Sequence, residues 1–158
     1  GTIGKSLGGA AGGYVAGPSY VTDALIQAAR PHIFSNAISP PTAGSAMAAI
    51  DLMGREPERV ESLRRKTRFF RQGLKDLGFN PLEGESAIVP IIIGETADAI
   101  KTAEAMLEEG IFVTGFGFPV VPEGEARVRV QISDGLTQED MEKALKAFEK
   151  VGRNLELI

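Results

Sequence analysis

A single lysine, Lys5, lies within a glycine-rich run near the start of the chain. The run reads Gly-Thr-Ile-Gly-Lys-Ser-Leu-Gly-Gly-Ala-Ala-Gly-Gly-Tyr over residues 1–14. Because glycine has no side chain, backbone can pack closely around whatever binds beside the lysine amine. Desolvation in such a site lowers the pKa of a lysine and makes the neutral amine available as a nucleophile. The run therefore predicts a reactive site at Lys5.

Two other interpretations of the run compete with this one. Residues 4–6, Gly-Lys-Ser, match the end of a phosphate-binding loop, G-x-x-x-x-G-K-[ST]. The first glycine of that motif would precede residue 1, and the lysine of such a loop opens a helix. Residues 7–13 contain four glycines, each of which costs a helix about 1 kcal/mol relative to alanine, so the phosphate loop is disfavoured. A structural glycine turn with an incidental lysine stays open on these residues alone.

The composition bounds the class of protein. A chain of 158 residues fits one domain, or one small domain with a piece of another. It starts within the lysine motif and without a methionine, as expected of a piece of a longer protein. The absence of cysteine favours the cytoplasm, and a single histidine offers no metal site. A net charge of −4, and the lack of an apolar run near the roughly 20 residues of a membrane span, argue against nucleic acid and membrane as partners.

The first 41 residues carry only three charged side chains and are rich in glycine. A segment of this kind is expected to be buried against the rest of a larger protein or against a partner. Residues 13–16 predict a short buried strand. Apolar residues at helical spacing from Val21 predict a helix that ends at Pro31.

Residues 42–78 predict two helices that link the segments on either side. Thr42 is expected to cap the first of them, over residues 43–53. The second helix ends at Gly78 and has an apolar face at helical spacing. Its other face carries the basic residues Arg64, Arg65, Lys66, Arg68 and Arg71. Such a face is usually solvated, and a phosphate-binding role is the alternative.

Residues 79–158 alternate strand and helix patterns, which predicts a small α+β domain with helices packed on one side of a sheet. The expected strands are residues 87–93, 111–114 and 126–132. Pro90 indicates an edge strand or a bulge. Thr96 is expected to cap a helix that ends at Gly110. Residues 137–140, Thr-Gln-Glu-Asp, are similar to a capping box and predict the start of a last helix.

Short motifs spread over nearly the whole chain occur together in one order. They are TIGKSLGG (residues 2–9), GGY (12–14), RPHIFSN (30–36), VTGF (113–116), PVVP (119–122) and ARVRVQIS (126–133). Together they resemble the C-terminal part of the α-oxoamine synthases, pyridoxal-phosphate enzymes with an aminotransferase-like fold. The resemblance implies an α/β fold in three parts. Residues 1–41 would end the large cofactor-binding domain, 42–78 would be linking helices, and 79–158 would form a small C-terminal α+β domain.

The resemblance implies pyridoxal 5′-phosphate as the cofactor and gives roles to four residues. Lys5 would form the Schiff base with the cofactor and move protons at the substrate α-carbon. Thr2 would bring a hydroxyl to the cofactor phosphate, and Ser35 would reach the phosphate of a neighbouring subunit, so that a homodimer shares its active sites. Arg129 would bind the substrate carboxylate, a task suited to the planar guanidinium. Arg127 lies on the same face of the expected strand, so spacing alone leaves the choice between the two arginines open.

Within the family, the PVVP and ARVRVQ motifs are most similar to the glycine C-acetyltransferase branch. This implies a transferase of threonine degradation that condenses glycine with acetyl-CoA to 2-amino-3-ketobutyrate and catalyses the reverse cleavage. Leu136 stands where the family usually has a histidine, which leaves open another member such as 8-amino-7-oxononanoate synthase. A non-catalytic interaction module derived from such an enzyme is the alternative of another class. The groups that hold the cofactor ring would precede residue 1, so this chain alone is expected to be inactive.

Overall fold

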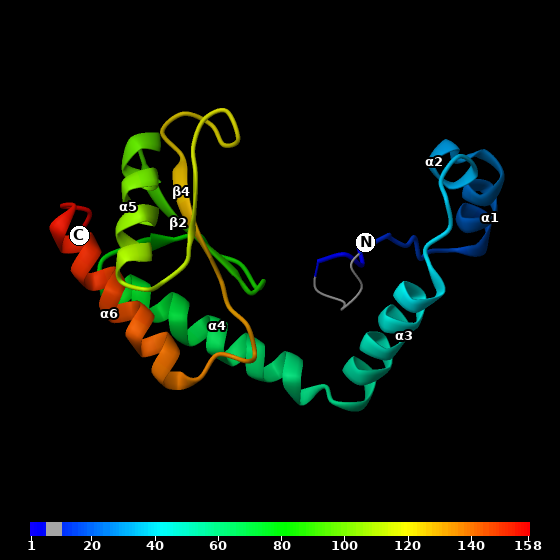
Figure 1. Ribbon diagram of the computed structural model, residues 1–158, viewed down its shortest axis with the longest axis horizontal. Coiled ribbons are helices and arrows are strands. Elements are labelled where there is room, and N and C mark those ends of the chain that lie inside the picture. Colours follow the sequence, from blue (N-terminus) through cyan, green and yellow to red (C-terminus); the bar gives the residue numbers. More distant parts are fainter. Residues whose placement is uncertain (6–10) are drawn as a thin grey trace. The chain divides into compact units, whose positions relative to one another are not determined.

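The computed structural model describes residues 1–5 and 11–158, and the chain divides into two compact units (Figure 1). The first unit spans residues 1–57 and the second spans residues 58–158. The three-part division into 1–41, 42–78 and 79–158 stays a prediction about domains. Within the described residues, no helix combines the length and the apolar character that a membrane span requires.

The described residues of the first unit form three helices and a short backbone bridge. They are α1 (Ser19–Ala28), α2 (Arg30–Ile33), α3 (Pro40–Arg55) and an antiparallel bridge between Thr2 and Gly13. The expectation of a short buried strand over residues 13–16 was wrong, because these residues are exposed and, of the four, Gly13 alone forms a β-bridge. Pro31 lies in the first turn of α2 instead of ending α1. A proline is tolerated there because the first helical N–H groups have no partner within the helix.

The start of α3 also differs from the expectation. Ser39 is the capping residue, and its hydroxyl oxygen accepts a hydrogen bond from the Thr42 backbone N–H at 3.4 Å. The prediction that Thr42 caps this helix was therefore wrong. The helix begins earlier because Pro40 and Pro41 occupy the first turn, where a missing N–H and a fixed φ suit the helix.

The first unit leaves most of its large apolar side chains in contact with solvent. Tyr20 is 75% exposed and Phe34 is 77% exposed, whereas Ile3 and Ala46 are the buried apolar residues among those described up to residue 57. Isolated exposed apolar residues are ordinary, but a surface with this many of them is typical of a region that another surface covers. Burial of this segment against a partner stays a prediction.

The second unit is an antiparallel sheet with three helices. Its elements are α4 (Glu58–Asp76), β1 (Asn80–Pro81), β2 (Ile88–Gly94), α5 (Thr96–Glu108), β3 (Thr114–Phe116), β4 (Ala126–Gln131) and α6 (Gln138–Asn154). The strand order is β1-β2-β4-β3, and every neighbouring pair is antiparallel. As predicted, α4 ends just before Gly78, whose φ of +101° suits a residue without a side chain.

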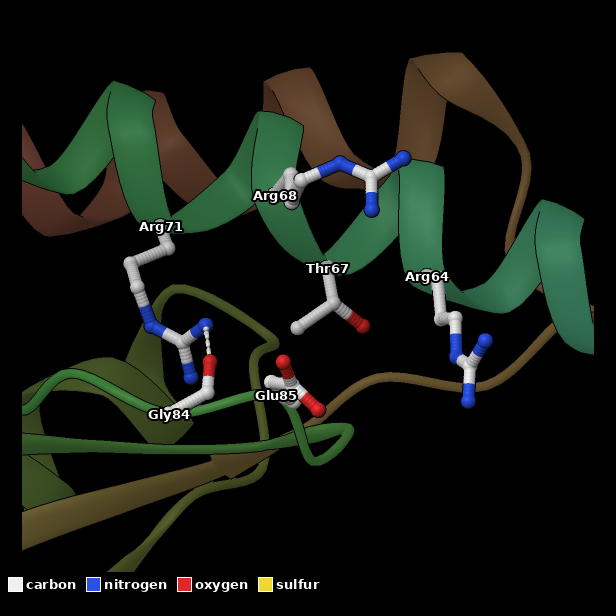
Figure 2. Close-up of a pocket in the computed structure, with 6 residues that line it drawn as sticks. All are labelled: Arg64, Thr67, Arg68, Arg71, Gly84 and Glu85. Carbon is white, nitrogen blue, oxygen red and sulfur yellow. Dashed lines mark hydrogen bonds between the residues drawn. The ribbon is translucent and has the colours of Figure 1, made fainter.

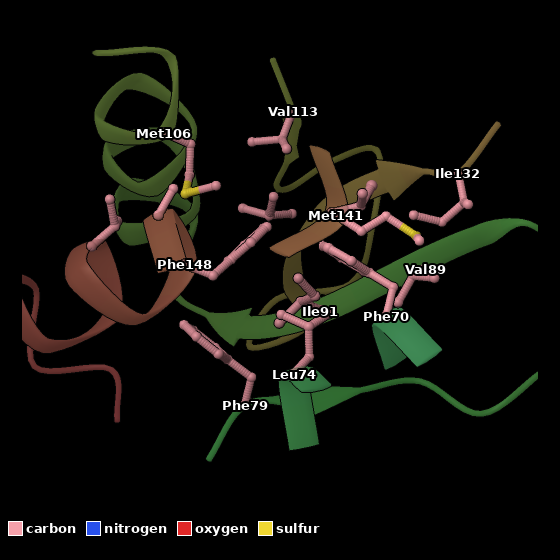
Figure 3. Close-up of a cluster of buried hydrophobic side chains, with 14 residues drawn as sticks. Phe70, Leu74, Phe79, Val89, Ile91, Met106, Val113, Ile132, Met141 and Phe148 are labelled. Atoms are coloured by element: carbon pink, nitrogen blue, oxygen red, sulfur yellow. The ribbon is translucent and has the colours of Figure 1, made fainter. Parts of the chain in front are cut away.

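The core of this unit lies between one face of the sheet and the three helices. Phe148 of α6 is fully buried, and its ring meets the edges of Phe70 and Phe79 at centroid distances of 6.2 and 5.6 Å. Figure 3 shows these rings converging with Met106 of α5 and Ile91 of β2. The three helices thus pack on one side of the sheet, which confirms the predicted α+β arrangement of this part of the chain.

Details of the sheet depart from the expectations. Pro90 was expected to mark an edge strand or a bulge. β2 is not an edge strand, since it pairs with β1 on one side and β4 on the other, and its register with β4 shifts between Ile92 and Gly94. The Pro90 carbonyl accepts a hydrogen bond from the Leu82 N–H at 2.8 Å, so the N–H that proline lacks would point to this same side, at the residue that follows the end of β1. The strand predicted over residues 111–114 begins only at Thr114. The reason is local, because the Ile111 N–H is still bonded to the Met106 carbonyl of α5, at 2.9 Å.

The helix caps of the second unit follow two patterns. The capping box of α6 forms as predicted: Thr137 Oγ1 accepts from Asp140 N–H at 3.1 Å, and Asp140 Oδ2 accepts from Thr137 N–H at 2.8 Å. The Thr137 hydroxyl also donates to Asp140 Oδ2 at 2.7 Å, and this bond, followed by the one from the Thr137 N–H, holds the pKa of Asp140 below its usual value. Thr96, by contrast, does not cap α5. Its hydroxyl accepts a hydrogen bond from the Phe118 backbone N–H at 3.2 Å and so fixes the chain beyond β3.

Candidate active site

Two short segments of the glycine-rich run lie side by side as an antiparallel pair. Residues 1–3 pair with residues 12–14 through hydrogen bonds of 2.8–3.0 Å between their backbone groups. Lys5 follows the first of these segments, is exposed, and makes no ion pair with any residue that the structure describes. The rest of the predicted lysine motif, residues 6–10, lies outside the described residues. The Lys5 amine is therefore open to solvent and is not engaged by any described carboxylate.

Two glycines, Gly12 and Gly13, allow the paired segments and their surroundings to approach so closely. A Cβ added to Gly13 would lie 2.8 Å from the Gly1 carbonyl oxygen, so the paired backbones leave no room for a side chain. Gly12 has a φ of +89°, and an added Cβ would lie 2.7 Å from Ile38 Cγ2. Ile38 follows Ser35 by three residues. The segment that carries Ser35 therefore passes close to these paired segments.

Two predicted hydroxyl groups are present in this unit. Thr2 is exposed on the bridge, and its hydroxyl donates to the Gly12 carbonyl at a long 3.5 Å. Ser35 is exposed between α2 and α3 and makes no hydrogen bond to another described residue. Thr2, Lys5 and Ser35 thus lie in one compact unit, with an amine and two hydroxyls that are weakly engaged or free. These groups fit a cofactor that carries an aldehyde and a phosphate, because an amine can react with the aldehyde and hydroxyls can donate hydrogen bonds to the phosphate.

The two candidate arginines lie on the second unit, on the face of the sheet opposite the helices. Along β4, alternate residues from Ala126 to Val130 are buried in the core, whereas Arg127 and Arg129 are not. Their shared face is confirmed. In the register of the sheet, Arg129 is flanked by Pro90 of β2 and Thr114 of β3.

The environments of the two arginines differ. Arg127 is tied to Glu125, with 3.0 Å between its Nη2 and a carboxylate oxygen and 3.0 Å between its Nε and the backbone carbonyl. Arg129 is exposed and makes no ion pair with a described residue. Its guanidinium carbon lies 4.5 Å from the centre of the Phe116 ring, within the range of a cation–π contact. Arg129 is therefore held in place while its donors remain available.

Phe116, which sequence reasoning did not single out, owes its position to glycine on either side. A Cβ on Gly115 would lie 2.9 Å from the Ala99 carbonyl oxygen of α5, and Gly117 lies against the Thr96 side chain. These glycines let β3 approach α5 closely, which leaves Phe116 beneath Arg129. The Gly-Phe-Gly pattern was visible in the sequence, but its pairing with β4 was not.

The close approach of Gly115 to α5 predicts that a side chain at this position lowers the free energy of unfolding. Gly115→Ala places a methyl group against a backbone oxygen that cannot rotate away, and overpacking of this kind costs about 1–3 kcal/mol. We expect urea unfolding to show that loss. Gly135→Ala is the matched control, because its added Cβ would meet Ser133 Oγ at an ordinary 3.6 Å. Equal stability of the two variants would contradict this account of β3.

Comparison with known families places these residues in context. The family model described as aminotransferase class I and II matches residues 1–148. The chain is 43% identical over all 158 residues to 8-amino-7-oxononanoate synthase of Symbiobacterium thermophilum. It is 43% identical over 152 residues, 96% of its length, to the mitochondrial 2-amino-3-ketobutyrate coenzyme A ligase of Homo sapiens. A Thermus thermophilus protein that carries both names is 42% identical over 157 residues.

The chain spans about 40% of the length of the Symbiobacterium and Thermus relatives and 36% of the human one. Solved structures agree with the sequence comparison. A structure of SPT with a PLP internal aldimine matches 99% of the chain, and 40% of its own, with a TM-score of 0.91 and 29% identity. The serine palmitoyltransferase of Sphingomonas wittichii matches the same shares with a TM-score of 0.90 and 27% identity. The fold is thus that of pyridoxal-phosphate transferases, as predicted.

Proposed function

Because this chain belongs to the aminotransferase class I and II family, we propose that the whole protein is an acyltransferase that condenses glycine with acetyl-CoA to 2-amino-3-ketobutyrate and catalyses the reverse cleavage. Its relatives place it among the α-oxoamine synthases, and its cofactor is pyridoxal phosphate. The observation that carries the proposal is the contrast between Arg127, which is paired with Glu125, and Arg129, whose guanidinium makes no ion pair with any residue that the structure describes.

Each proposed role follows from the chemistry of the side chain. Pyridoxal phosphate supplies an electron sink for negative charge at the amino acid α-carbon. The Lys5 amine would hold the cofactor covalently and, once released, transfer a proton at that carbon. The hydroxyl of Thr2 would donate to the cofactor phosphate, and Ser35 would do the same for a second subunit. Arg129 would bind the glycine carboxylate with two parallel N–H donors, which fixes the orientation of the α-carbon.

A homodimer is part of this proposal. A shared site requires the Ser35 segment to contact another subunit, and the first unit exposes the apolar side chains that an interface would cover, Tyr20 and Phe34 among them. Because the proposed ring-binding groups are not among these 158 residues, the chain by itself is proposed to be inactive. The proposal also includes a cytoplasmic location, supported by the absence of cysteine.

The acyl donor distinguishes the proposed activity from its main competitor. The second candidate is 8-amino-7-oxononanoate synthesis, which the name of the Symbiobacterium relative supports. Leu136, at the position of the usual family histidine, packs as a partly buried residue against the core, so the chain has no imidazole there to assist with either substrate.

We expect the whole protein to prefer acetyl-CoA with glycine over pimeloyl-CoA with alanine. A pocket shaped for the short acyl group discriminates by at least about tenfold in kcat/KM, since even one methylene changes this ratio by roughly 10–200-fold. Steady-state kinetics with both substrate pairs measures the preference. A strong preference for pimeloyl-CoA with alanine would reject the proposal in favour of the second candidate.

A further inference from the structure

A cavity of about 270 Å³ lies between α4 and the loop that precedes β2. Six residues line it: Arg64, Thr67, Arg68, Arg71, Gly84 and Glu85. Figure 2 shows Arg64, Thr67 and Arg71 extending from α4 toward the loop that carries Glu85, while the Arg68 side chain runs along the helix. The cavity belongs to the second unit and includes none of the residues proposed to hold the cofactor or the amino acid.

Arg71 differs from the other two arginines of this set because it is buried. Only 7% of its surface is exposed, and its guanidinium donates to the backbone carbonyls of Gly84 and, at 3.4 Å, of Ile88. Its Nε has no hydrogen-bond partner among the described residues. No described carboxylate forms an ion pair with Arg71. The nearby Glu83 carboxylate is paired with Lys75. A guanidinium stays charged in a protein, and a buried charge without a counter-ion is costly.

The other arginines add to this charge. Arg64 and Arg68 are exposed and form no ion pair with a described residue. Three guanidinium groups and the Glu85 carboxylate leave two positive charges around the cavity, in a chain whose net charge is −4. The Thr67 hydroxyl already donates to the Leu63 carbonyl at 2.8 Å. The donors that face a ligand are therefore guanidinium N–H groups.

We propose that this cavity binds a phosphate monoester group. Such a group carries close to two negative charges at neutral pH, which matches the charge of the lining, and its oxygens accept paired guanidinium donors. The volume is several times the roughly 30 Å³ of a water and lies just below the roughly 300–1,000 Å³ of pockets for whole small molecules. It therefore suits a phosphoryl group with its adjoining atoms. The basic face of α4 is then a binding surface at Arg64, Arg68 and Arg71.

Titration calorimetry with inorganic phosphate at low ionic strength tests the proposal on the 158-residue chain. We expect Arg64→Gln and Arg68→Gln each to weaken phosphate binding by about tenfold, because each removes a charged donor. Both side chains are exposed and form no ion pair within the described part of the chain, so thermal unfolding should stay near that of the parent chain. Arg65→Gln is the matched control: Arg65 is the neighbour of Arg64 on the same helix, is exposed, and does not line the cavity.

Glu85→Gln provides a change of opposite sign. Removal of the one carboxylate in the lining should tighten phosphate binding several-fold, because a like charge near a bound anion is unfavourable. The proposal is overturned if phosphate shows no saturable binding, or if Arg65→Gln weakens binding as much as Arg64→Gln does. Binding that Glu85→Gln leaves unchanged would also overturn it.

The phosphate can come from a small phosphorylated metabolite or from a larger ligand such as coenzyme A. Coenzyme A and dephospho-coenzyme A, which lacks the 3′-phosphate, separate these sources. If coenzyme A binds more tightly than dephospho-coenzyme A, and Arg64→Gln abolishes this difference, the cavity binds the 3′-phosphate of coenzyme A. Equal binding of the two, with the phosphate titration intact, would assign it to a separate phosphate monoester. Only the experiment with coenzyme A rests on the proposed function. The phosphate titration does not depend on the roles proposed for Lys5 and Arg129, so its failure is distinguishable from a failure of the proposed function.

Discussion

Replacing Lys5 with alanine in the whole protein is expected to remove covalent retention of pyridoxal phosphate and almost all activity. A positioned proton-transfer group alone contributes roughly 10²–10⁴-fold to the rate, so kcat should fall by at least about a hundredfold. The visible absorption of the bound cofactor should disappear as well. Borohydride reduction followed by mass spectrometry measures retention directly, because in the parent protein the peptide that contains Lys5 should carry the added mass.

Lys101→Ala is the control for this experiment. Lys101 is an exposed lysine of α5, 3.5 Å from an Asp98 carboxylate oxygen, and its loss removes the same charge from another place. It should leave the cofactor and the rate unchanged. An unaltered spectrum in Lys5→Ala would show that another lysine holds the cofactor. A parent protein without any labelled peptide would instead favour a non-catalytic interaction module.

The second large effect is expected at Arg129. Loss of a charge-assisted, paired contact to the substrate carboxylate should cost about 2–5 kcal/mol of transition-state stabilisation, read from kcat/KM for glycine. Cofactor retention should change little, because the proposed cofactor contacts come from Thr2, Lys5 and Ser35. Arg129→Lys keeps the charge but not the planar fork, so its kcat/KM should lie between those of the parent and Arg129→Ala.

Arg127→Ala is the matched control on the same strand face. Its guanidinium is already engaged by Glu125, so its removal should lower kcat/KM for glycine far less. A larger effect of Arg127→Ala than of Arg129→Ala would mean that the face is assigned correctly and the residue is not. Comparison of kcat/KM with cofactor absorbance, in each variant, separates substrate binding from loss of the cofactor.

Where the controlling interactions are local, the sequence predicted the structure well. The capping box at the start of α6 needs only residues 137–140, and the end of α4 needs only a glycine that adopts positive φ. The alternation of core and open positions along β4 follows from the geometry of a strand. The prediction for Thr42 was wrong because Ser39, three residues earlier, caps the helix instead. The prediction for Thr96 was wrong because its hydroxyl accepts a hydrogen bond from the distant Phe118 backbone.

The amino-acid sequence by itself determined the family and the cofactor through its short motifs. Hydrophobic periodicity and turn residues also predicted the order of the elements from α3 onward, except for β1. Only the tertiary structure decided which arginine of β4 is paired with a carboxylate and which one, among the described residues, contacts an aromatic ring instead, since the positions of Glu125 and Phe116 depend on pairing and packing that no spacing reveals. Burial of Arg71 beside a cavity was likewise invisible, because its position in α4 predicts a solvated face while the loop at Gly84 folds over it. Contacts between segments distant in sequence arise only when the chain packs, and they set the charge and the availability of each side chain.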